Sequence, residues 1–468
     1  MRYLLSTMLV LASLTAPTFG GDLRVGAAAV VITPPVGTPM AGYYSERAAE
    51  GVHDDLYVKA LVLEQDGAKA ALVSLDLIST SRSVVTEARR EIERTTGVPG
   101  AAVMISATHS HTGPVLNTRE PRANALGGTS DLAQRYTAEL PAKISEAVKR
   151  AEAALAPARA AAGHGHEASI AFNRRYHMQD GTIGWNPGKL NPRVIKPAGP
   201  IDPDVPVVCF MSPANKPLAL YVNYAVHLDN VGGLKVSADL PYTLSKLLAD
   251  VAGPDVVTLY TTGCCGDVNH VDVAWAEPQK GFENAARMGT ILAAEVMRTM
   301  PRLKPVAAGP LRVKSEIVKL PLPPVLADEI EKARATIERR GESRSANRVP
   351  FLEQVNAFKV LDVAGRQGKP HEVEVQVIAL GRDVAWVSLP GEIFVELGLA
   401  VKQDSPFPHT VIAELANGSV GYVPARRAYV QGNYEVVSTR CAEGSGELLV
   451  AAAVKLLKDL HAQATTDK

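Results

Sequence analysis

Residues 103–114 read VMISATHSHTGP, an apolar run that ends abruptly in a His-Ser-His sequence beginning at His109. The run has the length and composition of a buried strand. A second apolar run occupies 70–78, and the segment between them, 83–96, has helical spacing and ends at Gly97. This order predicts a β-α-β unit, whose right-handed crossover makes the two strands parallel. Ligands of open parallel sheets bind beyond the carboxyl ends of the strands, which is where His109 lies.

Four further apolar runs also end in residues that can take part in catalysis. The run at 217–226 ends in His227, 255–262 in GCCGD at 263–267, 384–389 in PGE at 390–392, and 410–416 in Asn417-Gly418 with Gly421-Tyr422 shortly after. Five such strands predict that these His, Asp, Glu and Tyr side chains lie close together along one edge of a sheet. Two histidines and a carboxylate around an open position are the ligands of catalytic zinc. A solvated loop is the alternative for a His-x-His sequence taken alone.

Length and composition indicate a globular chain with a sizeable core. It has 468 residues, of which 46% are hydrophobic, and a formal net charge of zero. The charged runs at 87–94 and 328–340 alternate in sign, as solvated helix faces do, so nothing indicates nucleic-acid binding. We expect an α/β fold of mixed, largely parallel sheets flanked by helices, with a metal site at the carboxyl ends of strands.

The N-terminus has the features of an export signal. Arg2 is followed by an apolar stretch at 3–16 and by small residues at 18–21, so we expect residues 1–21 to be a signal peptide. The apolar stretch is too short to span a bilayer. These features predict a secreted or periplasmic protein.

The cysteines are few: Cys209, Cys264, Cys265 and Cys441. An oxidising compartment permits disulfides, but their pairing stays open, and so few cysteines cannot stabilise a chain of this length. A soft-metal site at the adjacent Cys264 and Cys265 is the weaker alternative, because no second cysteine pair has zinc-finger spacing.

Other segments predict the organisation around these strands. Helices are expected at 131–155, 242–251, 282–300, 326–340 and 447–461, and a strand at 313–320. The segment 159–196 is rich in His, Gly, Asn and Pro, and we expect an irregular loop over the site. A polar break is expected at 341–347, after which the sheet resumes near Glu372.

Several motifs together resemble the catalytic domain of the neutral/alkaline non-lysosomal ceramidases, and they follow one another in the family's order. The motifs are ITPP at 32–35, Gly42-Tyr43, HSHTGP at 109–114, Asn173-Arg174, NYAVH at 223–227, GCCGDVN at 263–269, LPGE at 389–392, NGSVGY at 417–422 and NYEVVST at 433–439. The resemblance implies one zinc hydrolase domain over 22–468, with a sub-boundary near 310–325.

The resemblance also implies roles for individual residues. The family's zinc ligands fall on His109, His227, Glu392 and Tyr422. His111, Arg174 and Tyr434 match residues that line the family's substrate pocket and assist the amide chemistry. Zinc lowers the pKa of bound water from 15.7 to about 7, which supplies hydroxide at neutral pH. Arg174 or Tyr434 would then donate to the oxyanion formed from the amide carbonyl.

Three departures from the family's pattern bear on substrate choice. Asn269 and His270 stand where the family has serine and proline, and Asn269 is expected to position water or substrate. The C-terminal immunoglobulin-like domain of the family is not expected here. The segment 160–196 differs from the family in length and composition, so Arg175 is the alternative to its neighbour Arg174.

Each assignment also has a structural alternative. Glu392 is suited to cap a helix that begins at Ile393, His109 and His227 are suited to core positions, and Asp267 to a turn. His164, His166 and His177 form a looser group in which a second metal site is the weaker alternative. A serine hydrolase using Ser106 or Ser110 is weaker still, since no Gly-x-Ser-x-Gly sequence surrounds either serine.

The expected function is that of an exported zinc-dependent amidohydrolase that cleaves N-acyl amide bonds in ceramide or a related substrate. The expected partner is a small-molecule N-acyl lipid, with peripheral membrane contact left open. The alternative is an exported binding protein that keeps the zinc fold without the chemistry. Asn269 is the main support for this alternative.

Overall fold

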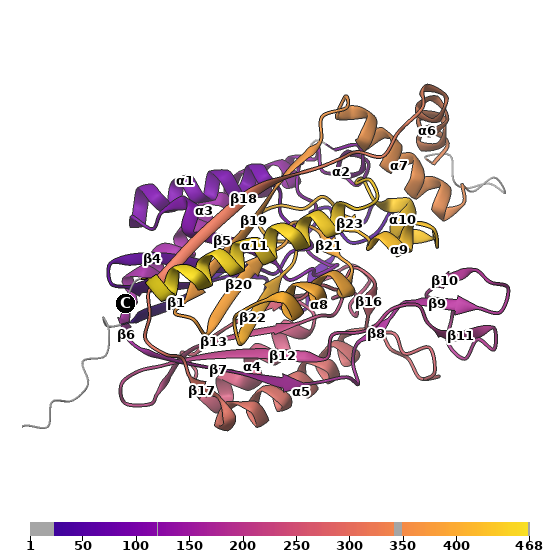
Figure 1. The fold of residues 1–468 in the computed structure, drawn as a ribbon. Coiled ribbons are helices and arrows are strands. Elements are labelled where there is room, and N and C mark those ends of the chain that lie inside the picture. The colour runs from indigo at the N-terminus through magenta and orange to yellow at the C-terminus, as the bar shows by residue number, and fades with distance from the viewer. Residues whose placement is uncertain (1–22, 119, 341–348, 467–468) are drawn as a thin grey trace, which may run out of the picture.

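The computed structural model describes residues 23–118, 120–340 and 349–466. The expected signal peptide at 1–21 and the polar break at 341–347 lie outside these residues. Within the described parts of the chain, the elements form three units, each with its own sheet and helices, that follow one another in sequence (Figure 1).

The first unit is built on a sheet with the strand order β5-β4-β3-β1-β6. Its strands are β1 (Arg24–Val31), β3 (Tyr57–Gln65), β4 (Ala68–Leu75), β5 (Val103–Ala107) and the short β6 (Ala156–Pro157). β1, β3 and β4 pair antiparallel, whereas β4 and β5 are parallel. Helix α1 (Arg82–Thr96) connects the parallel pair, and α3 (Asp131–Ala153) follows β5. The predicted β-α-β unit is therefore confirmed.

Local sequence explains the bounds of α1. The side chain of Ser81 accepts a hydrogen bond from the Val84 N–H at the start of the helix, as an N-cap residue does. The helix ends at Gly97, whose φ of 71° is left-handed and favours glycine.

The second unit has the strand order β15-β13-β12-β7-β17. Its strands are β7 (Arg159–His166), β12 (Asp204–Met211), β13 (Pro217–Tyr224), β15 (Val257–Thr262) and the short β17 (Lys304–Pro305). β7, β12 and β13 pair antiparallel, and β13 and β15 are parallel. Helix α4 (Leu240–Ala252) connects the parallel pair, and α5 (Phe282–Thr299) follows β15.

The third unit has the strand order β18-β19-β20-β22. Its strands are β18 (Leu311–Leu320), β19 (His371–Leu380), β20 (Val384–Ser388) and β22 (His409–Ala413). β18, β19 and β20 pair antiparallel, and β20 and β22 are parallel. Helix α8 (Val395–Asp404) connects the parallel pair, and α11 (Ser445–Thr466) follows β22.

The three units therefore share one plan: three antiparallel strands, a helix, a fourth strand parallel to the third, and a final helix. No repeat is visible in the sequence, so the shared topology is encoded by the order of apolar segments and connections and not by similar residues. The mixed α/β fold with helix-flanked sheets is confirmed. The pairing is more antiparallel than the sequence suggested, because the first three main strands of each unit pair antiparallel and only the fourth needs a helical crossover.

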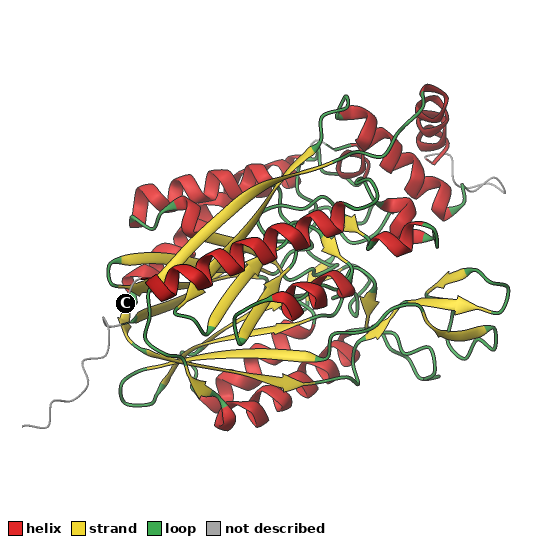
Figure 2. Ribbon diagram, in the orientation of Figure 1, coloured by secondary structure: helices red, strands yellow, loops and turns green. Residues whose placement is uncertain are grey.

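The inner faces of the three sheets enclose a common core. Leu61 and Met104 from the first sheet, Phe210 and Tyr221 from the second, and Trp386 from the third belong to one buried cluster. The outer face of each sheet is covered by the helices of its own unit: α1 and α3, α4 and α5, and α8 and α11 (Figure 2). The core thus fixes the three sheets relative to one another.

In each unit, a long connection joins the first strand to the second. Because the first, third and fourth strands run in the same direction, these connections leave from the edge where the parallel strands end. They span 32–56, 167–203 and 321–370, and include β2 (Gly51–Val52), β8 (Phe172–Asn173), β9 (Arg175–Met178), β10 (Ile183–Trp185), β11 (Val194–Pro197), α6 (Ala327–Arg340) and α7 (Phe351–Gly365). In Figure 1, α6 and α7 lie at the upper right of the view and the β9–β11 arm at the lower right.

The expectation of an irregular loop at 159–196 is wrong for its first part, which forms β7 between β12 and β17 of the second sheet. Its small residues hid the strand pattern and are required by close packing. A Cβ on Gly165 would lie 2.5 Å from Oε1 of Glu295 on α5, and one on Gly163 would lie 2.9 Å from the Leu303 side chain. The helices expected at 131–155, 242–251, 282–300, 326–340 and 447–461 are confirmed.

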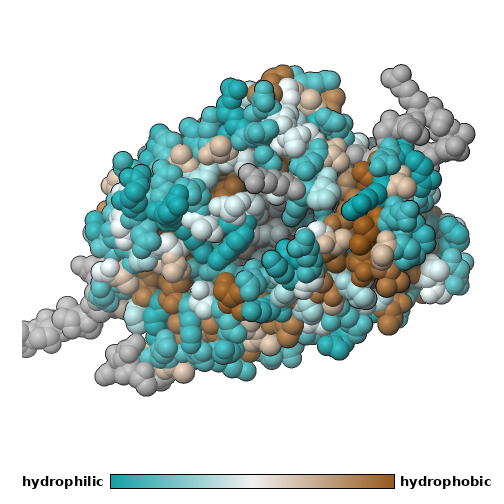
Figure 3. All heavy atoms as spheres, turned by 90° about the horizontal axis from the view of Figure 1, so that it is seen from above, coloured by the Kyte–Doolittle hydropathy of each residue, from teal (hydrophilic) through white to brown (hydrophobic). Residues whose placement is uncertain are grey.

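The surface seen from above is mostly hydrophilic, with hydrophobic residues gathered toward the right of the view (Figure 3). Of the helices that the structure describes, none combines the length and the apolar composition needed to cross a bilayer.

Candidate metal and catalytic site

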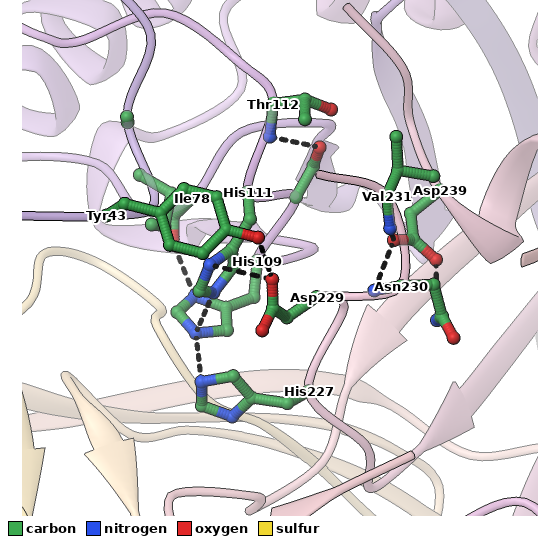
Figure 4. A network of polar contacts seen from close by, with 12 residues as sticks. Tyr43, Ile78, His109, His111, Thr112, His227, Asp229, Asn230, Val231 and Asp239 are labelled. Atoms are coloured by element: carbon green, nitrogen blue, oxygen red, sulfur yellow. Dashed lines mark hydrogen bonds and ion pairs between the residues drawn. The ribbon is translucent and has the colours of Figure 1, made fainter. Parts of the chain in front are cut away.

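Three histidine side chains meet at the carboxyl ends of β5 and β13. Nε2 of His109 lies 2.8 Å from Nε2 of His227 and 3.3 Å from Nε2 of His111. Oε2 of Glu392 lies 3.4 Å from Nε2 of His109 and 3.5 Å from Nε2 of His227. Figure 4 shows the imidazoles pointing toward one another. The three histidines form a buried group of the kind that holds a metal ion. Together with Glu392 they form the metal-type group of this protein.

The second ring nitrogens show why this group fits a cation. Nδ1 of His109 lies 2.8 Å from the Ile78 carbonyl oxygen, and Nδ1 of His227 lies 3.1 Å from that of Cys265. A carbonyl only accepts, so Nδ1 carries the hydrogen and Nε2 of the neutral ring carries a lone pair. Burial, and then the neighbouring His109, lower the pKa of His227 well below its usual value. Two lone pairs at 2.8 Å repel unless a cation lies between them.

Glu392 and Tyr422 are brought together by a short parallel pairing of β21 (Glu392–Ile393) with β23 (Tyr422–Val423), in which they are direct partners. The Tyr422 hydroxyl hydrogen-bonds to the Glu392 carboxylate. Burial raises the pKa of Glu392, but His109 and this hydroxyl lower it by more, to about 2. Burial and the Glu392 charge raise the pKa of Tyr422 well above its usual value. The pair therefore offers a carboxylate and a neutral phenol.

His111 also lies near an acidic residue, Asp229. Its Nδ1 is 3.7 Å from Oδ1 of Asp229, which accepts a hydrogen bond from the Tyr43 hydroxyl (Figure 4). The Arg47 guanidinium donates to the His111 carbonyl oxygen at 2.9 Å and lies 4.3 Å from the centre of the Tyr43 ring. Burial lowers the pKa of His111 to about 3, so the ring is a neutral base.

Arg174, and not Arg175, faces the site. Its guanidinium carbon lies 5.4 Å from the ring centre of Tyr422 and 5.8 Å from that of Tyr434. Nε of Arg174 donates to Oε1 of Glu435 at 2.8 Å, while Nη1 of Arg175 donates to Oε2 of the same carboxylate at 2.7 Å. The Arg175 guanidinium lies over the Phe394 ring instead. Glu435 is fully buried, so it fixes both arginines in place.

Aromatic residues from all three connections pack around Tyr434. Its ring centre lies 4.3 Å from that of Trp185, 5.5 Å from that of Phe351 and 5.4 Å from that of Tyr422. Tyr44, from the first connection, lies 5.5 Å from Phe351. The connections of the three units therefore meet at the site and orient the Tyr434 phenol.

Two features indicate that the backbone is tightly fitted here. His109 has φ of 74°, a left-handed conformation that is uncommon outside glycine and is found at functional sites. A Cβ on Gly42 would lie 2.4 Å from the His111 carbonyl oxygen, and one on Gly266 would lie 2.5 Å from that of Glu392. Only glycine allows these approaches.

A cavity of about 420 Å³ opens in front of the group. His109, His111, Glu392, Tyr422 and Tyr434 lie on its wall. Its volume is that of a small-molecule site.

Comparison with known proteins agrees with this geometry. Residues 23–227 match the family described as neutral/alkaline non-lysosomal ceramidase, N-terminal. This part of the chain is therefore similar to that ceramidase family. The fold is similar to the crystal structure of neutral ceramidase from Pseudomonas aeruginosa, with 20% identity and a TM-score of 0.74, over 94% of this chain and 75% of that one. A structure described as ceramidase complexed with C2 matches with the same identity and TM-score, over 94% and 76%. No curated protein matches the chain.

The ceramidase family and fold support a hydrolase, and most of the residues that the resemblance named lie together. The structure brings together His109, His111, His227, Glu392, Tyr422, Arg174 and Tyr434. Their individual roles stay predictions. The alternative that Glu392 caps a helix does not hold, since α8 begins at Val395.

Asn269 is the exception within the ceramidase motifs. It lies in β16 (Val268–Asn269), which pairs with β8, and it is not on the cavity wall. Its Nδ2 donates to Oδ1 of Asn186 at 3.0 Å, and its Oδ1 accepts from the Val271 N–H at 3.0 Å. The side chain therefore braces the second connection and does not reach the metal-type group.

Hydrogen bonds explain the positions of Asp267 and Ser110. Oδ1 of Asp267 accepts from the Val395 N–H at 2.9 Å, so this residue ties the segment after β15 to the start of α8. Oγ of Ser110 donates to the Ser237 carbonyl oxygen at 2.7 Å and is therefore directed to the backbone and not to a histidine.

No second metal site is found within the described residues. His164, His166 and His177 form no metal-type group there. All four cysteines are buried and free, so the described part of the chain contains neither a disulfide nor a cysteine metal group.

Sequence reasoning missed Asp229, which lies beside His111, and Glu435, which pairs with Arg174. Both stand next to named motifs, since Asp229 follows His227 closely and Glu435 follows Tyr434 directly. An acidic residue beside a predicted catalytic position was the available signal. Which base it would contact depends on the tertiary structure.

Proposed function

We propose that the protein is a zinc-dependent amidohydrolase that cleaves N-acyl amide bonds in ceramide or a related N-acyl lipid. The observation that carries this proposal is the convergence of the Nε2 atoms of His109, His111 and His227 with the Glu392 carboxylate at a cavity. The ceramidase structure described as complexed with C2 supports a small-molecule lipid substrate.

The metal would be held by His109, His227 and Glu392, with the Tyr422 phenol beside them. When bound, zinc would polarise the amide carbonyl and make bound water acidic enough to act at neutral pH. Neutral imidazoles and a carboxylate of low pKa suit this ion, because ligands must be deprotonated.

The residues around the group would carry the proton and stabilise the developing charge. Neutral His111 would take the proton of the attacking water at Nε2 and deliver it to the leaving nitrogen. Arg174 and the Tyr434 hydroxyl would donate to the oxygen of the amide carbonyl as it becomes negative. The C–O bond to water forms and the C–N bond breaks, which yields a fatty acid and an amine.

The test is hydrolysis of a panel of N-acyl amides and esters by purified protein, with and without a chelator. We expect release of fatty acid from at least one amide, loss of this activity with chelator, and recovery with zinc. If fully zinc-loaded protein is inert on every amide and ester, the amidohydrolase proposal fails.

We also propose that residues 1–21 direct export, on the basis of their composition. Fractionation of expressing cells tests this, with a chain beginning at Met followed by residues 22–468 as the control. Equal retention of both chains inside the cell would contradict export.

A further inference from the structure

The cavity extends from the metal-type group past a small apolar wall. Ala41, Val115 and Leu126 form a separate buried cluster there, with Ile78 and Ala123 packed against it. Such a wall accepts a short section of hydrocarbon by burial of apolar surface.

The rest of the cavity wall carries more basic than acidic residues. Four arginines lie on its wall: Arg82, Arg122, Arg366 and Arg440. Arg82 pairs with Glu374, and Arg440 pairs with Asp362, with Nε to Oδ2 at 2.7 Å. Arg122 and Arg366 are without a carboxylate partner among the described residues.

These two arginines are held in place by uncharged groups. The Arg122 guanidinium carbon lies 4.1 Å from the ring centre of Tyr44. Nε and Nη2 of Arg366 donate to the carbonyl oxygens of Lys369 and Pro370 at 3.0 Å and 2.7 Å. Neither contact neutralises the charge, so both guanidinium groups can still pair with an anion.

Acidic residues on the same wall do not cancel this charge. Glu392 belongs to the metal-type group. Glu372 lies 3.4 Å from Nζ of Lys319, and among the described lining residues Glu120 is the one further carboxylate, against the two guanidinium groups of Arg122 and Arg366. The charge balance of the cavity beyond Glu392 is therefore positive.

Two buried polar side chains on this wall have no hydrogen-bond partner at one atom. Oγ1 of Thr80 and Nε2 of His371 are unpartnered, although the residues are only 3% and 8% exposed. Thr80 lies just before the N-terminus of α1, and Arg82 and Ser83 of that helix line the cavity. Nδ1 of His371 is the nitrogen bonded to backbone, so only the Thr80 hydroxyl is an unpartnered donor here, and a buried donor beside a helix N-terminus is an element of an anion site.

We propose that the amine part of the substrate carries a carboxylate, so that the cleaved molecule is an N-acyl amino acid and not a neutral ceramide. This inference rests on the function proposed above. Arg122 and Arg366 would bind the carboxylate, while the acyl chain passes the apolar wall. Hydrolysis adds water across the C–N bond and releases a fatty acid and an amino acid, with no other reactant.

The first test compares N-dodecanoylglycine with N-dodecanoylethanolamine, which have the same acyl chain but differ in charge. We expect a kcat/KM at least about tenfold higher for the glycine compound, and a fall of at least about tenfold in this preference in Arg122→Gln and Arg366→Gln. Arg90→Gln is the matched control, because Arg90 is an exposed residue of α1 that pairs with Glu87 outside the cavity. An equal or higher rate on the ethanolamine compound would overturn the inference and leave the amidohydrolase function standing.

The second test does not depend on turnover. It measures binding of N-dodecylsulfonylglycine, whose sulfonamide resists this hydrolysis, and of the matching sulfonyl ethanolamine, by calorimetry on the metal-loaded protein. We expect tighter binding of the glycine compound, weakened at least about tenfold in the Arg122→Gln/Arg366→Gln double variant. Equal affinity in wild type and the double variant would refute the carboxylate site, whether or not any amide is cleaved. A protein that binds in this way but cleaves nothing would refute the enzyme proposal alone.

Discussion

At the scale of single residues, the proposed metal ligands and the proposed catalytic residues are held in place by different contacts. His109 and His227 have their second ring nitrogens fixed by backbone carbonyls, which turns Nε2 of each ring toward the other. Tyr434 is instead held by the packing of its ring against Trp185 and Phe351. Substitutions at these positions should therefore have different consequences.

We expect His227→Ala to lose both zinc and turnover, and Tyr434→Phe to keep zinc while turnover falls about 100-fold to 1000-fold. A ligand holds the ion, whereas an oxyanion donor acts only on developing charge. Elemental analysis alongside the amide assay measures both effects. His177→Ala, on β9 outside the group, should retain zinc and activity. Full zinc occupancy in His227→Ala would show that the ligand assignment is wrong.

Asn269 leads to a different expectation from the one its motif suggested. Because its amide bonds Asn186 and the Val271 N–H, Asn269→Ser should cost about 1 kcal/mol in the free energy of unfolding. The preference between anionic and neutral amides should change by less than about twofold. Denaturant unfolding and the paired substrate assay measure the two quantities. A change of preference toward ceramide in Asn269→Ser would restore the view that this position selects substrate.

At the scale of elements, helix α1 is tied to two sheets through one buried ion pair. Arg89 donates from Nε and Nη2 to the Val103 carbonyl oxygen of β5 at 2.9 Å and 2.6 Å. Its Nη1 donates to Oε2 of Glu374 on β19 at 2.7 Å. This contact joins the first and third units at the middle of α1, and Arg82 at the start of the helix pairs with the same Glu374. The helix that begins at the cavity is positioned by it.

Glu374→Gln should lower the free energy of unfolding by about 3 kcal/mol at pH 7, because it leaves buried Arg89 without its counter-charge. Burial raises the pKa of Glu374, but the Arg89 charge lowers it by more, so the folded pKa lies below the ordinary value of 4.5. The stability difference should be complete above about pH 4.5 and shrink as pH falls through the folded pKa. Urea unfolding at several pH values measures it.

Glu372→Gln is the control for this experiment, since Glu372 is an exposed residue of the same strand. Its effect should stay below about 0.5 kcal/mol. A pH-independent difference between wild type and Glu374→Gln would show that the pair does not carry the stabilisation.

At the scale of the whole molecule, each of the three units contributes residues to the same site. His109 follows β5 of the first sheet, His227 follows β13 of the second, and Glu392 follows β20 of the third. The common core fixes the sheets, so the ends of their parallel strands converge. A bound metal would therefore link all three units.

Metal removal should lower the stability of the whole fold. A ligand that binds only the folded state stabilises it by about 2.7 kcal/mol when its free concentration is about 100 times Kd. We expect Tm to fall with chelator and to rise again with zinc, in wild type but not in His227→Ala. Calorimetry over a series of zinc concentrations tests this, and the same zinc-dependent rise in both proteins would place the binding site elsewhere.

The sequence by itself determined most helices and strands, and the strand ends that carry the candidate site residues. Apolar runs that end just before His109, His227 and Glu392 placed these polar groups beyond strand ends. The sequence predicts such positions because strand patterns and turn residues are both set by neighbouring residues. The order of motifs indicated the ceramidase family, and capping residues such as Ser81 and Gly97 set helix bounds to within a residue or two.

Only the tertiary structure decided which of these groups meet. β7 was missed because its alanines and glycines fit beneath α5, a contact between segments far apart in sequence. Asn269 turns to Asn186, Glu435 fixes Arg174, and Asp229 lies beside His111. Arg122 and Arg366 reach the metal cavity from the α2 segment (Pro121–Ala125) and from the residue after α7. These contacts depend on the packing of three sheets around one core, and such long-range packing leaves no periodic signal in the sequence.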